Sequence, residues 1–309
     1  MRDYLIRRLL LFVPSMLAVY TFVFLLMHAT PGNPWDALSE KPLPDFVVEQ
    51  LNEAYHLNDP LWTQYTSYLK DALHGRLGPS YMQRGRDVME IMVDFLPISF
   101  QLALLAMTLA LILSIPAGVM SALKQNTWID HMITFVSIVN ITVPSFVRAI
   151  LLILFFSIYL HWLPAGGWNG ILGRNAIIPT LALAAGPWAL LTRYIRSGML
   201  EVIRMDYIRT ARSKGLSEAS VLLRHALKNA LIPATTVAGV AFASLVTGSF
   251  YIESVCMVPG IGRYFVKSVT ARDYPVIMGT TLLWATLIWI MNLVVDVFYS
   301  YLDPRIRYN

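Results

Sequence analysis

The side chains of this sequence that could carry out chemistry are few and scattered. A phosphate-binding loop requires Gly-x-x-x-x-Gly-Lys-Ser/Thr, and no Gly-Lys pair occurs among the 309 residues. His-Glu-x-x-His and Gly-x-Ser-x-Gly are absent too. The single cysteine, Cys256, excludes an intramolecular disulfide and a cysteine metal cluster. The histidines lack the spacing of metal ligands; they are His28, His56, His74, His131, His161 and His225. We therefore expect no catalytic residue and no metal site in this chain.

Two charged residues, Arg148 and Asp296, stand inside otherwise apolar stretches. A charge at the centre of a membrane-spanning helix costs roughly 2.5–3.5 kcal/mol on insertion scales and often marks a functional position. In a continuous helix Arg148 would lie roughly 25 Å from the cytoplasmic start of its span, at 1.5 Å per residue, whereas Asp296 would lie near the cytoplasmic face. We therefore expect no ion pair between them and an interfacial position for Asp296.

Arg148 has two interpretations that the sequence leaves open. It either lines a translocation pathway, together with its neighbours Pro144 and Ser145, or extends its side chain towards the membrane surface. Pro144 stands four residues earlier and can bend or break the helix, which would change the exposure of Arg148.

The densest group of cations is a set of eight Lys and Arg between positions 193 and 228, and it contains a helix–break–helix pattern. Arg212 and Lys214 suit the last turn of a first helix, where cations favour the dipole. Gly215 can supply the left-handed residue that ends this helix. Ser217 can cap a second helix, with Glu218 in its first turn.

The second helix of this segment is expected to be amphipathic. Its apolar ridge consists of Leu222, Leu223, Ala226, Leu227 and Ala230, while Arg224 and Lys228 face away. A short amphipathic helix suits either the surface of a membrane or a groove on a partner protein.

The elements that position these residues are predicted to be membrane-spanning helices. Hydrophobic residues make up 56% of the chain and charged residues 14%, and the mean hydropathy is +0.56, which is too apolar for a soluble domain of this length. The apolar residues gather in runs of about 20, the length that crosses a bilayer. The six runs are Leu9–Met27, Ile98–Leu123, Ile133–Leu160, Ile177–Leu191, Leu231–Ile252 and Val276–Leu302.

The distribution of Lys and Arg predicts that both termini are cytoplasmic. Fourteen would lie inside and nine outside, as the positive-inside rule favours. The loop at 193–228 supplies eight of the fourteen and accounts for the net charge of +5, so the basicity indicates a membrane loop rather than a nucleic-acid partner.

The chain divides into three predicted parts. Residues 1–28 form an N-terminal signal anchor, because the first run is longer than the apolar core of a cleaved signal peptide. Residues 29–97 hold ten Asp and Glu against five Lys and Arg and form an extracytoplasmic helical cap, which either covers the first span or docks a partner protein. Asp45 and Asp59 are the expected N-caps of its two helices. Residues 98–309 form a core of five further helices, with the basic loop at 193–230.

The basic loop resembles the cytoplasmic coupling loop of binding-protein-dependent ABC importer permeases, which is built around an "EAA…G" motif. The segment reads Asp-Tyr-Ile-Arg-Thr-Ala-Arg-Ser-Lys-Gly-Leu from position 206, followed by Arg-His-Ala-Leu-Lys-Asn-Ala-Leu-Ile-Pro from position 224. This variant is similar to the peptide/nickel class. Arg209 stands in place of the motif's Glu and Thr210 in place of its first Ala, whereas Ala211 and Gly215 match.

Further segments resemble the same family in the same order along the chain. They are Pro31-Gly32-Asn33-Pro34, Leu57-Asn58-Asp59-Pro60-Leu61, Gly75-Arg76-Leu77-Gly78-Pro79-Ser80, Pro259-Gly260-Ile261-Gly262-Arg263, Arg272-Asp273-Tyr274-Pro275 and the B-type ending Leu302-Asp303-Pro304-Arg305-Ile306-Arg307-Tyr308.

The resemblance implies an all-α integral membrane protein with six transmembrane helices in the type I ABC importer architecture. It implies a non-catalytic permease in the bacterial or archaeal cytoplasmic membrane, which forms half of a pathway for peptides or similar small solutes. The expected partners are a second, homologous permease, two ATPase subunits that bind ATP and Mg, and an extracytoplasmic substrate-binding protein. The residues expected to contact the ATPase are Arg209, Thr210, Ala211, Gly215, Leu216, Ser217, Glu218, Leu222, Leu223 and Arg224.

Two other classes of membrane protein remain as alternatives. A secondary transporter would normally repeat its hydrophobic pattern in two halves, and this chain shows no such repeat. A membrane-embedded receptor or assembly subunit would not require the basic coupling-type loop. The sequence does not select among peptides, nickel chelates, glutathione-like thiols and sugars as the substrate.

Overall fold

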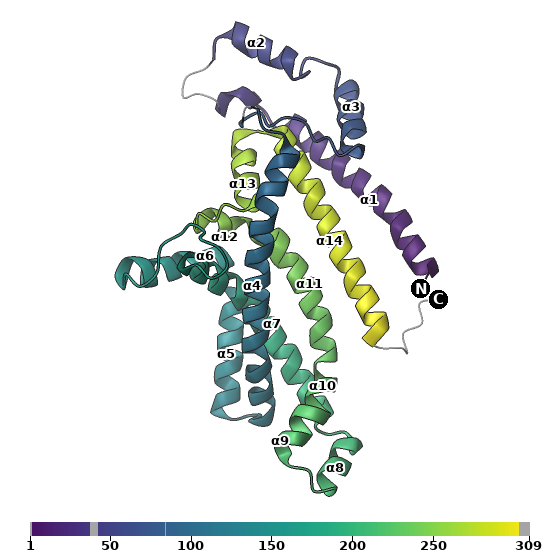
Figure 1. The fold of residues 1–309 in the computed structure, drawn as a ribbon, viewed down its shortest axis with the longest axis vertical. Helices are drawn as coiled ribbons and strands as arrows, with labels where there is room; N and C mark the ends of the chain where they lie inside the picture. The colour runs from purple at the N-terminus through teal and green to yellow at the C-terminus, as the bar shows by residue number, and fades with distance from the viewer. Residues whose placement is uncertain (1, 38–42, 84, 303–309) are drawn as a thin grey trace. The chain divides into compact units, whose positions relative to one another are not determined.

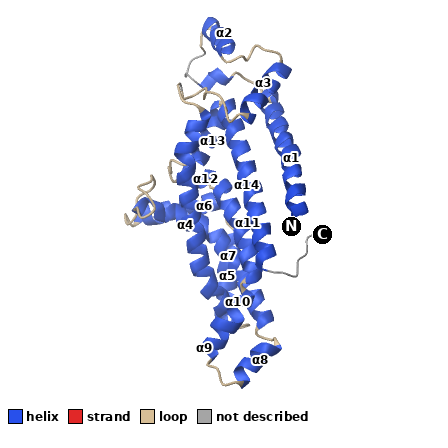
Figure 2. Cartoon of the chain, turned by 45° about the vertical axis from the view of Figure 1, so that its right-hand side comes forward, coloured by secondary structure: helices blue, strands red, loops and turns tan. Residues whose placement is uncertain are grey.

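The computed structural model describes residues 2–37, 43–83 and 85–302. Within these ranges the regular structure is helical, apart from one isolated antiparallel bridge between Pro79 and Asp87 (Figures 1 and 2). The B-type ending at 303–308 lies outside the described residues. The elements in chain order are α1 (Arg2–Ala29), the 3₁₀ turn η1 (Pro34–Ala37), α2 (Asp45–Ala54), α3 (Leu61–Leu73), α4 (Val88–Leu123), α5 (Trp128–Thr142), α6 (Ser145–Leu152), the π-helix η2 (Ile153–Tyr159), the 3₁₀ turn η3 (Arg174–Ala176), α7 (Ile177–Val202), α8 (Asp206–Ser213), α9 (Glu218–Ser220), the π-helix η4 (Val221–Ala226), α10 (Leu227–Ala230), α11 (Ile232–Gly248), α12 (Phe250–Val255), α13 (Ile261–Ala271) and α14 (Tyr274–Leu302).

Four helices in the described part of the chain are long and apolar enough to cross a membrane, and six spans result if each of two bent pairs counts as one. The four are Ile6–Ala29, Val88–Leu123, Arg174–Val202 and Tyr274–Val294, and the bent pairs are Trp128–Thr142 with Ser145–Tyr159 and Glu218–Ala230 with Ile232–Gly248. Each predicted apolar run therefore corresponds to a helix or a bent pair, which confirms the all-α membrane class.

The third predicted run is not one straight helix. Its two halves meet at an angle of 104°, with Val143 and Pro144 in extended conformations between them (Figure 1). Pro144 lacks the N–H that would continue α5 and its ring disfavours the helical conformation at Val143. The depth of roughly 25 Å expected for Arg148 counts the rise of a straight helix, and that count does not hold across this bend.

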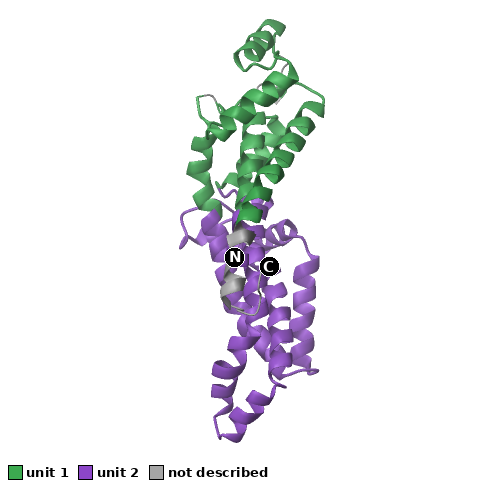
Figure 3. Ribbon diagram, turned by 90° about the vertical axis from the view of Figure 1, so that its right-hand side faces the viewer, with its two compact units in different colours: residues 1–99, 259–289, 308–309 green, residues 100–258, 290–307 purple. Residues whose placement is uncertain are grey.

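The chain forms two compact units, coloured separately in Figure 3. Unit 1 contains residues 1–99 and 259–289, and unit 2 contains residues 100–258 and 290–307. The predicted three-part division rests on membrane topology and stays a prediction.

Unit 1 contains the predicted helices of the first loop and two apolar clusters. One cluster gathers α1 with α14, and the other gathers α4 with α13 and α14. Their buried members are Tyr20, Phe24, Met27 and Met278 in the first, and Leu77, Val88, Ile91, Met92, Ile261 and Val276 in the second.

Pro44 and Pro60 occupy the N-cap positions of α2 and α3. The sequence pattern favours Asp45 and Asp59 as caps, and that expectation is wrong. Each proline adopts an extended conformation immediately before its helix, with φ of −58° and −53°. Asp45 becomes the first helical residue, while the carboxylate of Asp59 lies 3.5 Å from His56 Nδ1.

The external motifs of the resemblance meet around Asp273, which is 2% exposed. Its carboxylate accepts hydrogen bonds from Ser80 Oγ (2.5 Å), Tyr81 N (3.1 Å) and Met82 N (3.2 Å). The neighbouring Arg272 donates from Nη1 to the Asn33 carbonyl oxygen at 3.3 Å. Segments about 190 and 240 positions apart in the sequence are thereby joined by polar contacts within unit 1.

Unit 2 is built around α7. Half of this helix's 26 residues are buried, and α4, α5, α6, α10, α11 and α12 border it. Apolar side chains such as Leu191, Ile195 and Met199 are fully buried in this position. Helix α7 leads directly into the basic loop, so it connects the loop to the apolar part of the unit.

Candidate functional site

The basic loop folds as a helix, a sharp turn and a second helical segment at one end of unit 2 (Figure 1). Helix α8 ends at Ser213, and Gly215 has φ +77°, the left-handed conformation predicted for it. Arg212 crosses this turn and binds Glu218 through two hydrogen bonds, of 3.1 Å from Nε and 2.7 Å from Nη2. The paired fork fixes the direction in which the second segment leaves the turn.

The predicted cap of the second helix is only half right. Ser217 occupies the N-cap position with extended dihedral angles, but its side chain makes no capping hydrogen bond. Glu218 turns towards Arg212 instead. The carboxylate therefore stabilises the turn by an ion pair with the preceding helix.

The predicted apolar ridge is wrong in part, because six residues of the second segment form a π-helix. Val221 and Ala226 are fully buried, five positions apart as the wider π turn requires. Leu222 and Leu227 are half-buried. Leu223 is 65% exposed and does not belong to the buried face.

Most of the predicted contact residues form one exposed surface around the turn. We call it the coupling surface, and its members are Arg209, Thr210, Gly215, Leu216, Ser217, Glu218, Leu223 and Arg224. Ala211 is 8% exposed and Ile208 is fully buried, on the α8 helix that packs against η4. The match of Ala211 to the family motif thus falls on a packing position.

A second candidate site lies where α5 breaks. Pro144 carries no N–H, so the Asn140 carbonyl loses the donor that a continuous helix would supply. Arg148 Nη1 donates to that Asn140 oxygen and, at 2.6 Å, to the oxygen of Val143. Nε and Nη2 donate to the Ala182 oxygen of α7 at 3.3 and 3.1 Å. The guanidinium replaces the donor that the proline lacks and ties the break to α7.

An open cavity of about 550 Å³ lies beside this break within unit 2. Ser145 and Arg148 line it from α6, Gly186 and Tyr194 from α7, and Ser244 from α11. Pro144, the third predicted pathway residue, forms the break but is not among the residues that line this cavity. Gly186 lies next to the guanidinium, because a Cβ there would be in ordinary van der Waals contact with Arg148 Nη2, at 3.8 Å. The surroundings combine an apolar wall with one cation and a few hydroxyl groups.

Helices α8 and α9, which carry part of the coupling surface, lie apart from α6, which lines the Arg148 cavity (Figure 1). Arg148 binds backbone carbonyls within the described chain, and Asp296 is half-buried in the last turns of α14. The role of Arg148 in transport and the role of the coupling surface in contacting the ATPase remain predictions.

The sequence reasoning missed an ion pair between Asp130 and Arg196. Asp130 is 3% exposed, and both of its oxygens accept from Arg196 at 2.8 Å. The predicted third run began at Ile133, so it left Asp130 in a loop, whereas α5 begins at Trp128. Opposite charges just before the third run and just after the fourth are the signal that was available.

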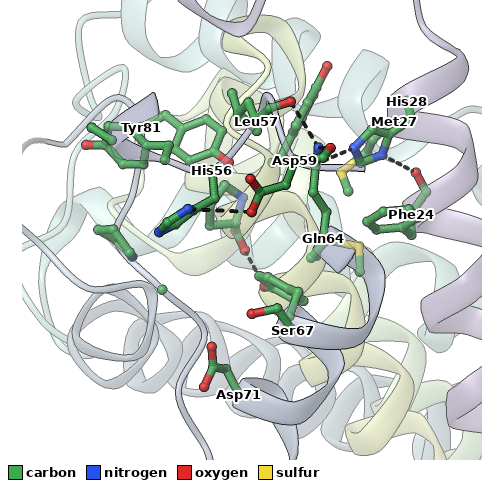
Figure 4. A pocket seen from close by; sticks show the side chains of 18 residues that line it. Phe24, Met27, His28, His56, Leu57, Asp59, Gln64, Ser67, Asp71 and Tyr81 are labelled. Atoms are coloured by element: carbon green, nitrogen blue, oxygen red, sulfur yellow. Dashed lines mark hydrogen bonds and ion pairs between the residues drawn. The ribbon is translucent and has the colours of Figure 1, made fainter. Parts of the chain in front are cut away.

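Unit 1 contains a separate cavity of about 340 Å³ (Figure 4). His28 binds the Gln64 amide oxygen at 3.2 Å on one wall. Tyr68 and Tyr81 also line the cavity. Burial and nearby carboxylates raise the pKa of each phenol. Both phenols are therefore neutral at physiological pH, and they act as hydrogen-bonding and packing groups.

Comparison with known proteins identifies relatives along the whole chain. The model of the family described as "Binding-protein-dependent transport system inner membrane component" matches residues 114–308, and the model of its N-terminal membrane component matches residues 1–103. The oligopeptide transport system permease protein OppB of Escherichia coli (strain K12) is 42% identical over 308 residues, which cover 100% of each chain. The dipeptide transport system permease protein DppB of Bacillus subtilis (strain 168) is 40% identical over 99% of this chain and 98% of the relative.

A solved structure supports the same fold. An inward-facing form of the MetNI methionine ABC transporter aligns with a TM-score of 0.58 and 14% identity. The alignment covers 70% of this chain and 97% of the transporter chain. The two chains therefore share the type I arrangement of transmembrane helices. At 14% sequence identity, the likeness supports a common fold and no further property.

Proposed function

Because the chain belongs to the family of binding-protein-dependent transport system inner membrane components, we propose that it forms half of the pathway by which an ATP-driven importer carries peptides. As a permease subunit it is non-catalytic, and it is an integral protein of the inner membrane. Separate ATPase subunits hydrolyse the ATP. ATP and Mg are held by those subunits and not by this chain.

The proposed substrate class is peptides. The supporting observation is that relatives named for oligopeptide and dipeptide transport align at 40–42% identity from end to end. A nickel chelate, a glutathione-like thiol or a sugar would be the alternative cargo. The cavity beside Arg148, with its hydroxyl and cationic groups on an apolar wall, suits a solute with both polar and apolar groups.

The proposed assembly contains a second permease of the same family, two ATPase subunits and an extracytoplasmic binding protein. We place both termini on the cytoplasmic side because Lys and Arg are more frequent in the loops assigned there. The acidic loop at 29–97 then lies outside, where the binding protein delivers its cargo.

The coupling surface is the proposed contact with the ATPase subunits, and its geometry carries this part of the proposal. The fork from Arg212 to Glu218 holds the turn while Leu216, 42% exposed, and Leu223, 65% exposed, project beside charged residues. Apolar anchors within a charged rim are the usual composition of an energetically important protein contact.

Reconstitution tests the proposal. The chain, its partner permease and both ATPases are placed in liposomes with the binding protein, and uptake of labelled trialanine is measured with and without ATP. We expect uptake that requires ATP and the binding protein. Uptake driven by an ion gradient without ATP would instead identify a secondary transporter, and uptake of a nickel chelate alone would contradict the peptide assignment.

A further inference from the structure

One buried carboxylate joins three elements at the end of unit 2 that carries the basic loop. Asp130 lies in the first turn of α5 and, among the described residues, accepts four hydrogen bonds. Arg196 of α7 donates two at 2.8 Å, and Ser121 Oγ of α4 donates one at 2.5 Å. The backbone N–H of Asn126, in the α4–α5 turn, donates the fourth at 3.0 Å. The turn between α4 and α5 is thereby fixed to α7.

The same part of α7 makes two close contacts through glycines. A Cβ on Gly118 of α4 would lie 2.7 Å from the Ile195 side chain and 2.9 Å from the Thr192 carbonyl oxygen. A Cβ on Gly198 of α7 would lie 2.6 Å from the carbonyl oxygen of Ala230 in α10. Backbones this close leave little side-chain freedom to absorb a displacement.

These contacts connect the two candidate sites of unit 2. Helix α7 precedes the part of the basic loop that carries the coupling surface, and α10 follows it. The two helices contact each other at Gly198, two residues from Arg196. On the other side of the ion pair, α5 leads to the break at Pro144, where Arg148 binds α7 again. Helix α5 and the break that follows it are therefore held to α7 at both ends.

An ion pair between a buried carboxylate and a partly exposed arginine is not required for stability, because a well-packed apolar pair of similar size often stabilises a fold as well. Its distinguishing property is geometric, since an arginine fork on a carboxylate permits one relative position of the two helices. We infer that Asp130 and Arg196 are a positioning pair that transmits movement of the coupling loop to the broken span α5–α6 and its cavity. This inference rests on the proposed function.

The test removes the ion pair without leaving a buried charge unpaired. In the complete complex in lipid nanodiscs, Asp130→Leu combined with Arg196→Met should leave assembly and the basal ATPase rate near wild type. The ratio of the ATPase rate with trialanine-loaded binding protein to the basal rate should fall at least about fivefold, the lower end of typical couplings. Lys124→Gln removes an exposed charge from the same α4–α5 turn without touching the ion pair and should leave the ratio unchanged.

Two results would overturn the inference. One is an unchanged ratio in an assembled double variant. The other is loss of assembly both in the double variant and in Asp130→Asn, which keeps the shape of the side chain, because the pair would then hold the fold together rather than transmit movement. A wild-type complex that trialanine-loaded binding protein fails to stimulate would contradict the proposed function itself, and the inference with it.

Discussion

Arg148 shows how a residue that looks costly in a membrane can be satisfied by backbone alone. The guanidinium binds carbonyl oxygens of Asn140, Val143 and Ala182, two of which belong to the end of α5 beside Pro144. Buried or membrane-embedded cations are tolerated when such acceptors surround them. The residue therefore combines a place on the cavity wall with a structural task at the break.

We predict that both tasks require arginine. Arg148→Ala should lower trialanine uptake by on the order of tenfold while the complex still assembles, and Arg148→Lys should lower it nearly as much, because an ammonium cannot serve three separate carbonyls with a planar fork. Uptake by proteoliposomes and co-purification of the ATPases measure the two effects. Normal uptake by Arg148→Lys would show that the charge alone matters, and normal uptake by Arg148→Ala would remove Arg148 from the pathway.

Cys256 is predicted to be chemically silent in the folded protein. Its side chain is fully buried, and burial raises the pKa of the thiol to about 12. Because a thiol is neutral below its pKa, the raised pKa keeps Cys256 protonated up to a higher pH, so at about pH 8 almost no thiolate is present to react. N-ethylmaleimide should leave Cys256 unmodified in membranes and modify it after denaturation, as mass spectrometry would show. Rapid modification in membranes would contradict the buried position.

At the scale of the element, the turn at Gly215 is the feature on which the coupling surface depends. Its φ is +77°, and a Cβ added there would meet no atom within 4 Å. The penalty for another residue is therefore conformational rather than steric. This distinction separates Gly215 from Gly198, where a Cβ would meet the α10 backbone.

We predict that Gly215→Val abolishes binding-protein-stimulated ATP hydrolysis without preventing membrane insertion or pairing with the second permease. A β-branched residue is strongly disfavoured at positive φ, whereas asparagine tolerates it, so Gly215→Asn should retain most of the stimulation. Gly170 has φ +84° and equally open surroundings in unit 2, which makes Gly170→Val a matched control that should stay stimulated. Full stimulation of Gly215→Val would mean that this turn does not transmit the signal.

The π-helix η4 separates two leucines that an α-helical pattern would place on one ridge. Leu223 is 65% exposed, and Leu222 is half-buried. We predict that Leu223→Ala weakens association with the ATPase subunits by about 1–2 kcal/mol and leaves the permease fold intact. Leu222→Ala should instead lower the thermal stability of the permease. Titration of the ATPases against nanodisc-held permease measures the first effect, and equal ATPase affinities for wild type and Leu223→Ala would place the contact elsewhere.

At the scale of the whole molecule, the bend of 104° at Pro144 means that the number of apolar runs does not by itself determine the membrane topology. A bent pair either crosses the membrane or turns back to the side from which it came. If the pair at 128–159 turned back, every later loop would change sides. The basic loop at 193–230 would then lie outside, against the positive-inside rule.

Single cysteines test this topology, and the silent Cys256 permits the test in the native background. We expect His56→Cys and Asn169→Cys to react with a membrane-impermeant maleimide from outside, and Ser213→Cys only from the cytoplasmic side. All three positions are exposed, so differences in labelling report the side of the membrane. Labelling of Asn169→Cys and Ser213→Cys from the same side would show that the topology is wrong, and a re-entrant pair would be one explanation.

The sequence by itself determined the membrane class, the family and the approximate positions of the helices. These properties follow from local patterns. The patterns are apolar runs long enough to cross a bilayer, an excess of cations in one loop, and a glycine, Gly215, at the end of a helix. Each depends on neighbours in the sequence, and composition and spacing therefore suffice to find it.

The tertiary structure decided which residues meet. It replaced the expected caps at Asp45 and Asp59 by prolines, removed Leu223 from the buried ridge and paired Asp130 with Arg196 across 66 positions. It also gave Arg148 the carbonyls of a broken helix as partners. Polar groups in an apolar surrounding must find partners wherever the packing places them, and that placement depends on contacts between distant segments, which no local pattern records.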